Sequence, residues 1–286
     1  MKICMACGQR HQQADWLCPA CGWTPPRRLG FFSFAPNITA EAAGFKAEFF
    51  NQLAATEKDH FWFRSRNRLL AWALQTFFPH AQSLLEIGCG TGFVLLSLRA
   101  AFPSLKLTGG EIFCEGLAIA KRVSEVTLFQ MDARRIPFEN EFDVIGAFDV
   151  LEHVGEDEPV LRQMRQATKL GGGILVTVPQ HRWLWSTWDT LSGHRRRYVR
   201  KELEKKIERA GFRVVRSTSF VSFLLPLMIL VRLLERKKVD DMTMKLKISH
   251  LLNACLEQVL RLEHLLIRMG VSLPAGGSLL VIAYKN

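Results

Sequence analysis

The stretch "LLEIGCGTGFVLL", Leu84 to Leu96, places three glycines at alternate positions directly after an apolar run that carries a carboxylate. The run "SLLEIG" has the length of a short buried strand, and "FVLLSLRAAF" predicts a helix that ends before Pro103. Glycines in such a turn allow a ligand to lie against bare main chain, with Glu86 just before it. The rest of the chain has to indicate what that ligand is.

The same strand–turn–helix pattern continues along the chain. It predicts helices over residues 114–123 and 158–170 and strands over 105–112, 126–133, 142–150 and 174–179. Beyond these lie a predicted helix over 198–210, a strand over 212–219 and a last, antiparallel strand over 278–286. Alternating β and α units of this length indicate a parallel sheet with helices on both faces.

Ligands of such sheets bind at the carboxyl ends of the strands. The glycine turn after the first strand and Glu111, which ends the second, are therefore expected to meet at one ligand. A carboxylate in that place can accept hydrogen bonds from two ribose hydroxyls. The turn reads G-C-G-T-G instead of the G-x-G-x-x-G of dinucleotide-binding folds, which makes a nicotinamide cofactor the weaker alternative.

The succession "EIGCGTG", Glu111, "QMDARRIPF", "FDVLEHV" and "LGGGILVTVP" resembles the class I S-adenosylmethionine-dependent methyltransferases over roughly residues 61–212. The resemblance implies a Rossmann-like, doubly wound α/β sheet of the seven-stranded methyltransferase type, with S-adenosylmethionine as methyl donor. It implies that the glycine turn holds the methionine part, that Glu111 takes the ribose and that Asp132 accepts from the adenine amino group. The cofactor-binding residues implied in this way are Glu86, Gly88, Cys89, Gly90, Gly92, Glu111, Ile112, Met131, Asp132, Ala133 and Phe148, the last beside the sulfonium.

Residues 57–74, "EKDHFWFRSRNRLLAWAL", have the apolar periodicity of a helix that precedes the first strand. Their "HFWFRSR" portion resembles a lead-in of bacterial quinone- and sugar-modifying methyltransferases. The resemblance implies that Trp62 covers the cofactor and that Arg66 pairs with its carboxylate. The alternative is an aromatic helix that only packs on the sheet, with its arginines in solvent.

The segment after the strand over 142–150 reads "DVLEHV". If Asp149 opens a short helix, Asp149, Glu152 and His153 share one face and can bind Mg²⁺ or another divalent ion, or His153 can act as a base. The segment resembles the E-x-x-E-H metal-binding sequence of quinone-biosynthesis O-methyltransferases and of small-RNA 2′-O-methyltransferases. In the RNA enzymes a later histidine, matched here by His194, completes the site, whereas Asp149 departs from the pattern.

The catalytic candidates are therefore His153, Glu152 and His194, and the possible second metal site adds Asp149 to them. His181 and Asp189, on the loop after the strand over 174–179, are weaker candidates for the same cleft. The alternative is that the "LEH" groups bind no metal, cap a helix and shape the pocket.

Two C-x-x-C pairs lie in the first part of the chain, and both are followed by glycine. Two such knuckles can close a tetrahedral cage of four thiolates around a structural zinc ion, which leaves no open position for catalysis. The pattern resembles a short zinc ribbon with Cys4, Cys7, Cys18 and Cys21 as ligands. Two disulfides are the alternative, which a reducing compartment disfavours.

Residues 220–277 are far longer than a hairpin connection needs. Residues 220–238, "FVSFLLPLMILVRLLERKK", are apolar on all sides and end in basic residues, and 249–270 are amphipathic. An apolar helix with a basic tail is typical of a peripheral membrane contact, although Pro226 and the short length argue against a spanning helix. A cap over the acceptor pocket and a homodimer face are the alternatives.

The sequence thus divides into a zinc ribbon (1–28), a linker and lead-in (29–56), a methyltransferase core (57–219), a helical insert or cap (220–277) and a last core strand (278–286). With 286 residues, 48% of them hydrophobic, it suffices for one large α/β domain and an appendage. The net charge of +11 favours anionic partners. The start "MKICMACGQR" lacks the apolar core of a secretion signal, so we expect a cytoplasmic protein, peripheral at the inner membrane face if the insert binds lipid.

The leading expectation is O-methylation of a small-molecule, sugar, quinone or lipid-linked acceptor. RNA methylation is the second, although the basic residues are not interleaved with aromatic ones as in recognisable RNA modules. A binding or scaffold protein with a vestigial pocket is the third, and the intact Glu86, Glu111 and Asp132 argue against it. The acceptor itself is not determined, because acceptor pockets in this fold are built from variable loops.

Overall fold

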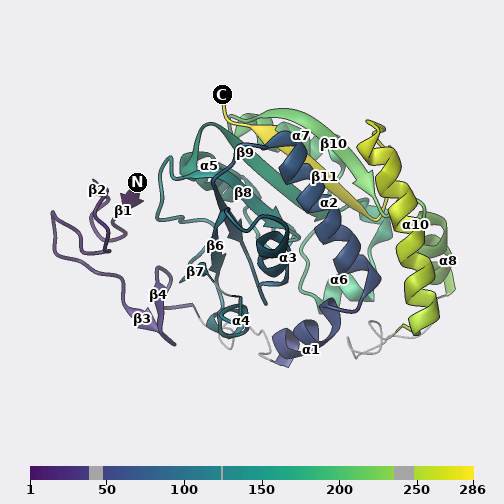
Figure 1. Ribbon diagram of the computed structural model, residues 1–286, viewed down its shortest axis with the longest axis horizontal. Helices are drawn as coiled ribbons and strands as arrows, with labels where there is room; N and C mark the ends of the chain where they lie inside the picture. The colour runs from purple at the N-terminus through teal and green to yellow at the C-terminus, as the bar shows by residue number, and fades with distance from the viewer. Residues whose placement is uncertain (39–47, 124, 235–247) are drawn as a thin grey trace.

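The central feature of the protein is one sheet of nine strands, seen in a computed structural model that describes residues 1–38, 48–123, 125–234 and 248–286 (Figure 1). From one edge to the other its strands are β10 (Arg213–Phe220), β11 (Ser278–Tyr284), β9 (Thr168–Pro179), β8 (Phe142–Phe148), β5 (Ser83–Ile87), β6 (Lys106–Glu111), β7 (Val126–Gln130), β4 (Phe31–Ser33) and β3 (Arg27–Arg28). Two further short strands, β1 (Lys2–Ile3) and β2 (Arg10–His11), pair antiparallel in a separate sheet.

The middle of the large sheet is parallel. Strands β9, β8, β5, β6 and β7 run in one direction, and β11 lies antiparallel between β9 and β10. Their apolar residues are fully buried, for example Leu84, Leu85 and Val144, because helices cover both faces of the sheet. The predicted Rossmann-like, doubly wound α/β sheet is confirmed, and β3 and β4 extend its seven strands to nine.

Two layers of helices make the two halves of the hydrophobic core. Buried side chains of α5 (Asp157–Ala167) and α7 (Arg200–Arg209) pack on one face of the sheet. On the other face lie α2 (Phe61–Phe77), α3 (Phe93–Ala101), α4 (Cys114–Ala120) and α10 (His250–Arg268). Three short helical elements lie on connections, namely α1 (Glu48–Glu57), a 3₁₀ turn (Arg182–Leu184) and α6 (Thr187–Leu191).

The N-terminal segment is attached to the sheet through strand pairing and aromatic packing. Residues 27–33 straddle the expected boundary between ribbon and linker, and they form the hairpin β3–β4, whose second strand pairs parallel with β7. Trp16, 5% exposed, packs its ring against Phe34 and Phe138 at centroid distances of 4.5 and 5.5 Å. The cysteine-rich segment therefore shares a hydrophobic core with the main domain.

Helix α5 ends three residues before the prediction, because Thr168 to Leu170 belong to β9. Thr168 pairs with Phe142 of β8, and its hydroxyl donates to the carbonyl of Met164 at 2.7 Å. A Cβ on Gly172 would lie 2.4 Å from the carbonyl oxygen of Asp143, so this glycine allows the close strand approach. Strand pairing thus overrides the helical pattern of the last residues.

The insert before β11 contains two helices among its described residues, α8 (Leu225–Leu234) and α10. The amphipathic pattern of 249–270 correctly predicts α10, whose N-cap Ser249 accepts from the backbone N–H of Leu252. In the described part of the chain, no helix combines the length and the apolar character that crossing a membrane requires. Residues 235–247, which include the expected basic tail at 236–238, lie outside the described residues.

Candidate functional site

The glycine turn connects β5 to α3 with a positive φ at each glycine, +67° at Gly88, +51° at Gly90 and +79° at Gly92. Only glycine adopts this conformation without strain. A Cβ on Gly88 would lie 2.6 Å from the side chain of Val150, which explains that glycine by packing alone. A Cβ on Gly90 would have one described neighbour within 4 Å, the ring of Phe50 at 4.0 Å, so Gly90 borders space that a ligand can use.

Glu111 at the end of β6 points back to the glycine turn. Its carboxylate accepts hydrogen bonds from the backbone N–H groups of Gly90 at 2.9 Å, Ile112 at 2.8 Å and Phe113 at 3.1 Å. Burial raises the pKa of Glu111, and these three donors act in the opposite direction by stabilising the charge. The predicted convergence of the turn and this acid is therefore present in the fold.

A second carboxylate, Glu86 in β5, is 3% exposed, and its Oε2 has no hydrogen-bond partner among the described residues. Burial raises the pKa of Glu86 well above its usual range, while the positive charge of Arg66 opposes the rise and the charges of Glu57 and Glu111 add to it. A buried polar atom without a partner is costly in a folded protein. Glu86 therefore has the character of a group held ready for a cationic ligand.

Glu57, the last residue of α1, is a site residue that the sequence did not single out. It is 4% exposed and accepts a hydrogen bond from the hydroxyl of Thr91 in the glycine turn. Burial raises the pKa of Glu57, and the nearby charge of Arg66 opposes that rise. Its only sequence signal is its position three residues before the "HFWFRSR" lead-in, which begins at His60.

Arg66 extends from α2 into this group of carboxylates. It is 8% exposed, its Nη1 donates to Oδ2 of Asp149 at 2.9 Å, and its guanidinium lies 4.9 Å from the ring centre of Trp62. The alternative of solvated arginines is wrong for Arg66. A buried guanidinium can bind the anionic group of a ligand. The carboxylates near it that have no ion-pair partner can bind a cationic group of the same ligand.

The residues expected around adenine follow the end of β7, and Phe148, expected beside the sulfonium, ends β8. Asp132 forms an ion pair with Arg134, whose Nε donates to both carboxylate oxygens at 3.0 Å. Met131 is buried against Gly110, and the ring of Phe148 is buried against Gly146. The other expected residues are placed beside them, with Cys89 buried and Ile112 and Ala133 half-buried.

Asp149 is placed differently from the expectation, since a turn over 151–153 replaces the short helix. Asp149 has a left-handed φ of +57°, and its side chain pairs with Arg66. A helix requires right-handed φ values, so Asp149 cannot continue one toward Glu152 and His153. The cluster of possible metal ligands accordingly contains Glu152, His153 and His194, with ligand atoms within 4.8 Å of one another, and lacks Asp149.

His194 is oriented by a buried acid. Its Nδ1 lies 2.9 Å from Oδ1 of Asp189, which is fully buried and also accepts from Nε of Arg197 at 2.7 Å. Burial acts to raise the pKa of Asp189, but the hydrogen bonds from His194 and Arg197 hold it well below its usual range. Because the ionised Asp189 only accepts hydrogen bonds, Nδ1 of His194 is the donor in this contact, and Nε2 is the nitrogen that a neutral ring leaves free to accept.

The free Nε2 of His194 faces Glu152, whose Oε1 lies 4.0 Å away. Glu152 is fully buried, and neither of its oxygens has a hydrogen-bond partner among the described residues. Burial, with the charge of Asp149 adding to it, raises the pKa of Glu152 well above its usual range. The exposed His153 packs edge to face on His194 at 4.7 Å, whereas His181 stacks on Trp183 and lies outside this cluster.

The four N-terminal cysteines converge, as the two knuckles predict. Their Sγ atoms lie within 4.8 Å of one another, with 3.7 Å between Cys4 and Cys21 and 3.6 Å between Cys7 and Cys18. The two loops have matching hydrogen bonds, since the glycine after each pair donates to the carbonyl of Cys4 or Cys18 at 2.9 Å. This cluster of thiols has the composition and the closeness of a tetrahedral metal site.

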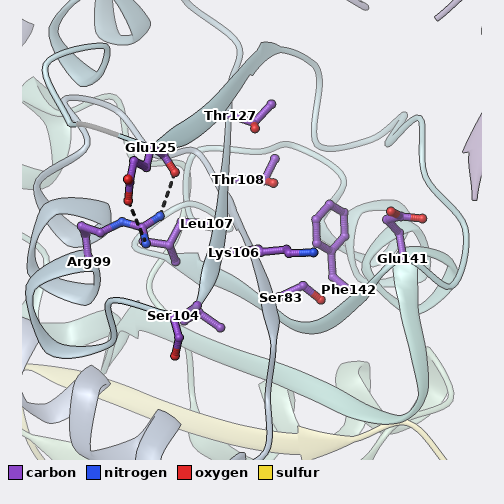
Figure 2. Close-up of a pocket in the computed structure, with 11 residues that line it drawn as sticks. Ser83, Arg99, Ser104, Lys106, Leu107, Thr108, Glu125, Thr127, Glu141 and Phe142 are labelled. Atoms are coloured by element: carbon purple, nitrogen blue, oxygen red, sulfur yellow. Dashed lines mark hydrogen bonds and ion pairs between the residues drawn. The ribbon is translucent and has the colours of Figure 1, made fainter. Parts of the chain in front are cut away.

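Figure 2 shows a pocket at the opposite ends of the strands. Its lining includes Ser83, Lys106 and Phe142, the first residues of β5, β6 and β8. Arg99 spans one side, where it donates to the carbonyl of Glu125 at 2.7 Å. The pocket lies at the amino ends of the strands and so is separate from the glycine turn and from Glu111.

A family model described as a methyltransferase domain matches residues 54–217 of the chain. The malonyl-[acyl-carrier protein] O-methyltransferase of Bacillus cereus is 31% identical over 101 residues, which cover 34% of this chain and 38% of that protein. The ubiquinone biosynthesis O-methyltransferase of Bordetella bronchiseptica is 28% identical over 158 residues, which cover 51% of this chain and 64% of that protein. The matches therefore span between a third and two thirds of these relatives' length.

Among solved structures, the phosphoethanolamine N-methyltransferase 2 of Haemonchus contortus in complex with S-adenosyl-L-methionine has a TM-score of 0.52 and 23% identity, covering 77% of this chain and 52% of that one. A chain from the complex between the Haloferax volcanii Trm112 methyltransferase activator and a putative methyltransferase has a TM-score of 0.53 and 15% identity. The match covers 82% of this chain and 97% of the Haloferax chain. At these identities the similarity shows the shared fold alone.

Proposed function

Because this chain belongs to the family of proteins that carry a methyltransferase domain, we propose that it transfers a methyl group from S-adenosylmethionine to a hydroxyl group of its acceptor. The observation that carries the proposal is the meeting of three features at the carboxyl ends of β5 and β6. These are the open side of Gly90, the ribose-type acid Glu111 and the unpartnered carboxylate oxygen of Glu86. A zwitterionic amino acid joined to a nucleoside requires such a combination.

The charges around the glycine turn fit the methionine end of that donor. Glu86 and Glu57 would hold its ammonium group, and Arg66 would hold its carboxylate, since two buried acids face one guanidinium there. Glu111 would accept from the ribose hydroxyls. Asp132 would bind the adenine amino group with the carboxylate oxygens that Arg134 now orients.

The donor supplies an activated methyl group on a sulfonium, so the chain has to align the acceptor, exclude water and remove a proton. We assign proton removal to Nε2 of His194, because Asp189 binds Nδ1 and so orients the ring with Nε2 as the nitrogen that can accept a proton. Arg197 fixes Asp189 in turn. A base of this kind favours a hydroxyl acceptor, which has to lose its proton during the transfer.

The acceptor class that we infer is a small-molecule, sugar, quinone or lipid-linked hydroxyl compound. Two of the relatives above are O-methyltransferases by name, one of them in ubiquinone biosynthesis. RNA methylation is the second candidate, and the net charge of +11 favours it. Retention on RNA that weakens steeply with salt would support RNA, and retention without a salt dependence would not.

We further propose that zinc fills the four-cysteine cluster and supports the fold, because a complete shell of thiolates leaves no position for a substrate. Glu152, His153 and His194 would be the ligands of a second divalent ion if one binds. Two imidazoles and one carboxylate suit Zn²⁺ or Mn²⁺ better than Mg²⁺, which prefers oxygen ligands. If turnover does not change when divalent ions are added or withdrawn, the assignment of this second metal site is refuted.

Calorimetric titration with S-adenosylmethionine tests the proposal directly. We expect binding by the wild-type chain and at least about tenfold weaker binding by Glu111→Gln, a change of about 1.4 kcal/mol. Glu115→Gln, on the neighbouring half-buried acid of α4, is the matched control and should bind like the wild type. Absence of binding by the wild type up to about 1 mM would refute the assignment. Labelled methyl transfer in a cell extract would then identify the acceptor.

A further inference from the structure

Helix α8 is almost entirely apolar, yet none of its described side chains is buried. Arg232 is its one charged residue. Leu230 is 52% and Leu233 75% exposed, and Leu227 and Val231 are similarly accessible. Apolar helices in water-facing positions are rare, because each exposed leucine forgoes the free energy of leaving water. Something other than water is therefore expected against α8.

Helix α10 presents a second apolar surface. Leu251, Leu262, Leu265 and Met269 follow one another at helical spacing, and each is more than half exposed. The opposite side of α10, which includes Leu260 and Ile267, is buried in the core that it shares with α2. The exposed leucines are thus additional to the stripe that the helix needs for folding.

Figure 1 draws α8 beside α10 at one side of the molecule. Glu263 of α10 holds the segment that leads into α8, because its carboxylate accepts hydrogen bonds from the backbone N–H groups of Val221, Ser222 and Phe223 at 2.6 to 2.8 Å. We call the exposed side chains of Leu230, Leu233, Leu251, Leu262, Leu265 and Met269 the apolar face.

Among the described residues of α10, the exposed charges have one sign. The two acids within α8 and α10, Glu257 and Glu263, are both buried and hydrogen-bonded. The exposed charges of α10 are basic, at Arg261 and Arg268. In the sequence, Glu235 follows α8 and precedes Arg236, Lys237 and Lys238, and these four residues lie outside the described residues. An anionic surface is therefore complementary to this part of the chain.

We propose that the apolar face inserts into the interfacial region of an anionic lipid bilayer, with α8 and α10 lying along the surface and no helix crossing it. The combination of exposed leucines and surrounding basic residues is what an interfacial contact requires. A second copy of the chain fits less well. A symmetric pairing would place arginine near arginine, with no exposed carboxylate on either helix to neutralise them.

Helix α10 is also attached to the segment that leads to the proposed cofactor site. Asn253 of α10 accepts from the backbone N–H of Phe61 at 2.8 Å and donates to the carbonyl of Asp59 at 2.7 Å. The α2 segment that begins there carries Trp62 and Arg66. A bilayer under α10 would therefore be near the entrance for a lipid-linked acceptor, and this last step rests on the proposed function, whereas the lipid contact does not.

Flotation of the full-length protein with vesicles tests the lipid contact. We expect the protein to float with vesicles of phosphatidylcholine that contain about 30% phosphatidylglycerol, because an anionic bilayer surface attracts basic residues. Pure phosphatidylcholine vesicles should bind markedly less. Leu233→Glu should lower the bound fraction about tenfold, since each buried leucine side chain contributes on this scale. Leu170→Glu is the matched control, because Leu170 is 73% exposed in β9, away from the apolar face.

Two outcomes would overturn the lipid contact. One is no flotation with either vesicle composition, and the other is equal flotation of Leu233→Glu and wild type. A concentration-dependent dimer that Leu233→Glu disrupts, without flotation, would assign the face to a second copy instead. Calorimetry with S-adenosylmethionine on the same proteins keeps the two proposals separate. If the wild type does not bind S-adenosylmethionine, the enzyme assignment is refuted, and flotation still tests the lipid contact of the apolar face.

Discussion

Alanine at Gly90 separates the folding role of the glycine turn from its binding role. Gly90 has φ +51°, and a Cβ there would have the Phe50 ring at 4.0 Å as its one described neighbour. Gly171 has φ +75°, and a Cβ there would meet nothing within 4 Å. Both Gly90→Ala and Gly171→Ala therefore pay the cost of a left-handed alanine, about 1–2 kcal/mol. Neither should prevent folding.

The two variants should differ in cofactor binding. A methyl carbon projects about 1.5 Å from Cα, whereas carbon atoms in contact stay about 3.5–4 Å apart. A donor that lies on the main chain at Gly90 would overlap that methyl. Overpacking of this kind costs about 1–3 kcal/mol, which corresponds to about 5- to 150-fold in the dissociation constant. Gly171→Ala, at the other end of the strands, should leave the affinity unchanged.

Urea unfolding would measure the stability of both variants, and calorimetric titration with S-adenosylmethionine would measure their affinity. We expect equal losses of stability and a loss of affinity in Gly90→Ala alone. If the Gly90→Ala variant shows the expected loss of stability and yet binds S-adenosylmethionine as tightly as the wild type, the claim that the donor lies against this peptide is refuted. Equal losses of affinity in both variants would also refute it, because the effect would then be one of folding.

Further predictions concern the zinc site, the buried acid and the base. Cys18→Ser should lose bound zinc by elemental analysis and lower the melting temperature by about 5 °C or more, whereas Cys255→Ser, at an exposed cysteine of α10, should do neither. Because burial raises the pKa of Glu86, the folded protein keeps its proton at pH values where the unfolded chain has lost it, so stability falls as pH rises above about 4. Glu86→Gln should therefore be more stable than wild type in urea at pH 8 by about 1 kcal/mol or more, with a difference that shrinks toward pH 4, while its affinity for S-adenosylmethionine falls. An unchanged or lowered stability at pH 8 would contradict this account. His194→Gln should slow methyl transfer about 100-fold with little change in donor affinity, and His181→Gln, outside the cluster, should have no such effect.

The strands of the parallel sheet and the glycine turn could be predicted because their signals are local. Buried strands such as Ser83–Ile87 are short apolar runs, and the glycines mark the turn that follows. Glu111 was placed correctly because the end of a strand is fixed by its own length and by the next helix. One exception is the end of α5, where pairing between Thr168 and Phe142 of β8 outweighs the helical periodicity.

Most contacts of the candidate site could not be predicted. Asp149 has a favourable spacing to Glu152 and His153, yet its left-handed backbone turns it toward Arg66 on a distant helix. Asp189 orients His194 over a separation of five residues, but its burial depends on Arg197 and on the surrounding loop. Likewise, nothing local to β4 indicates that it pairs with β7.

The sequence by itself determined that the chain forms a doubly wound sheet with a glycine turn and an acid at the carboxyl ends of two neighbouring strands, and that four cysteines form two knuckles. These features follow from periodicity, chain reversal and short spacing. The tertiary structure alone decided that Glu57 joins Glu86, that Asp149 leaves the histidine cluster and that the leucines of α8 and α10 remain exposed. Those outcomes depend on which surfaces pack together, and packing is a property of the whole chain that no short segment encodes.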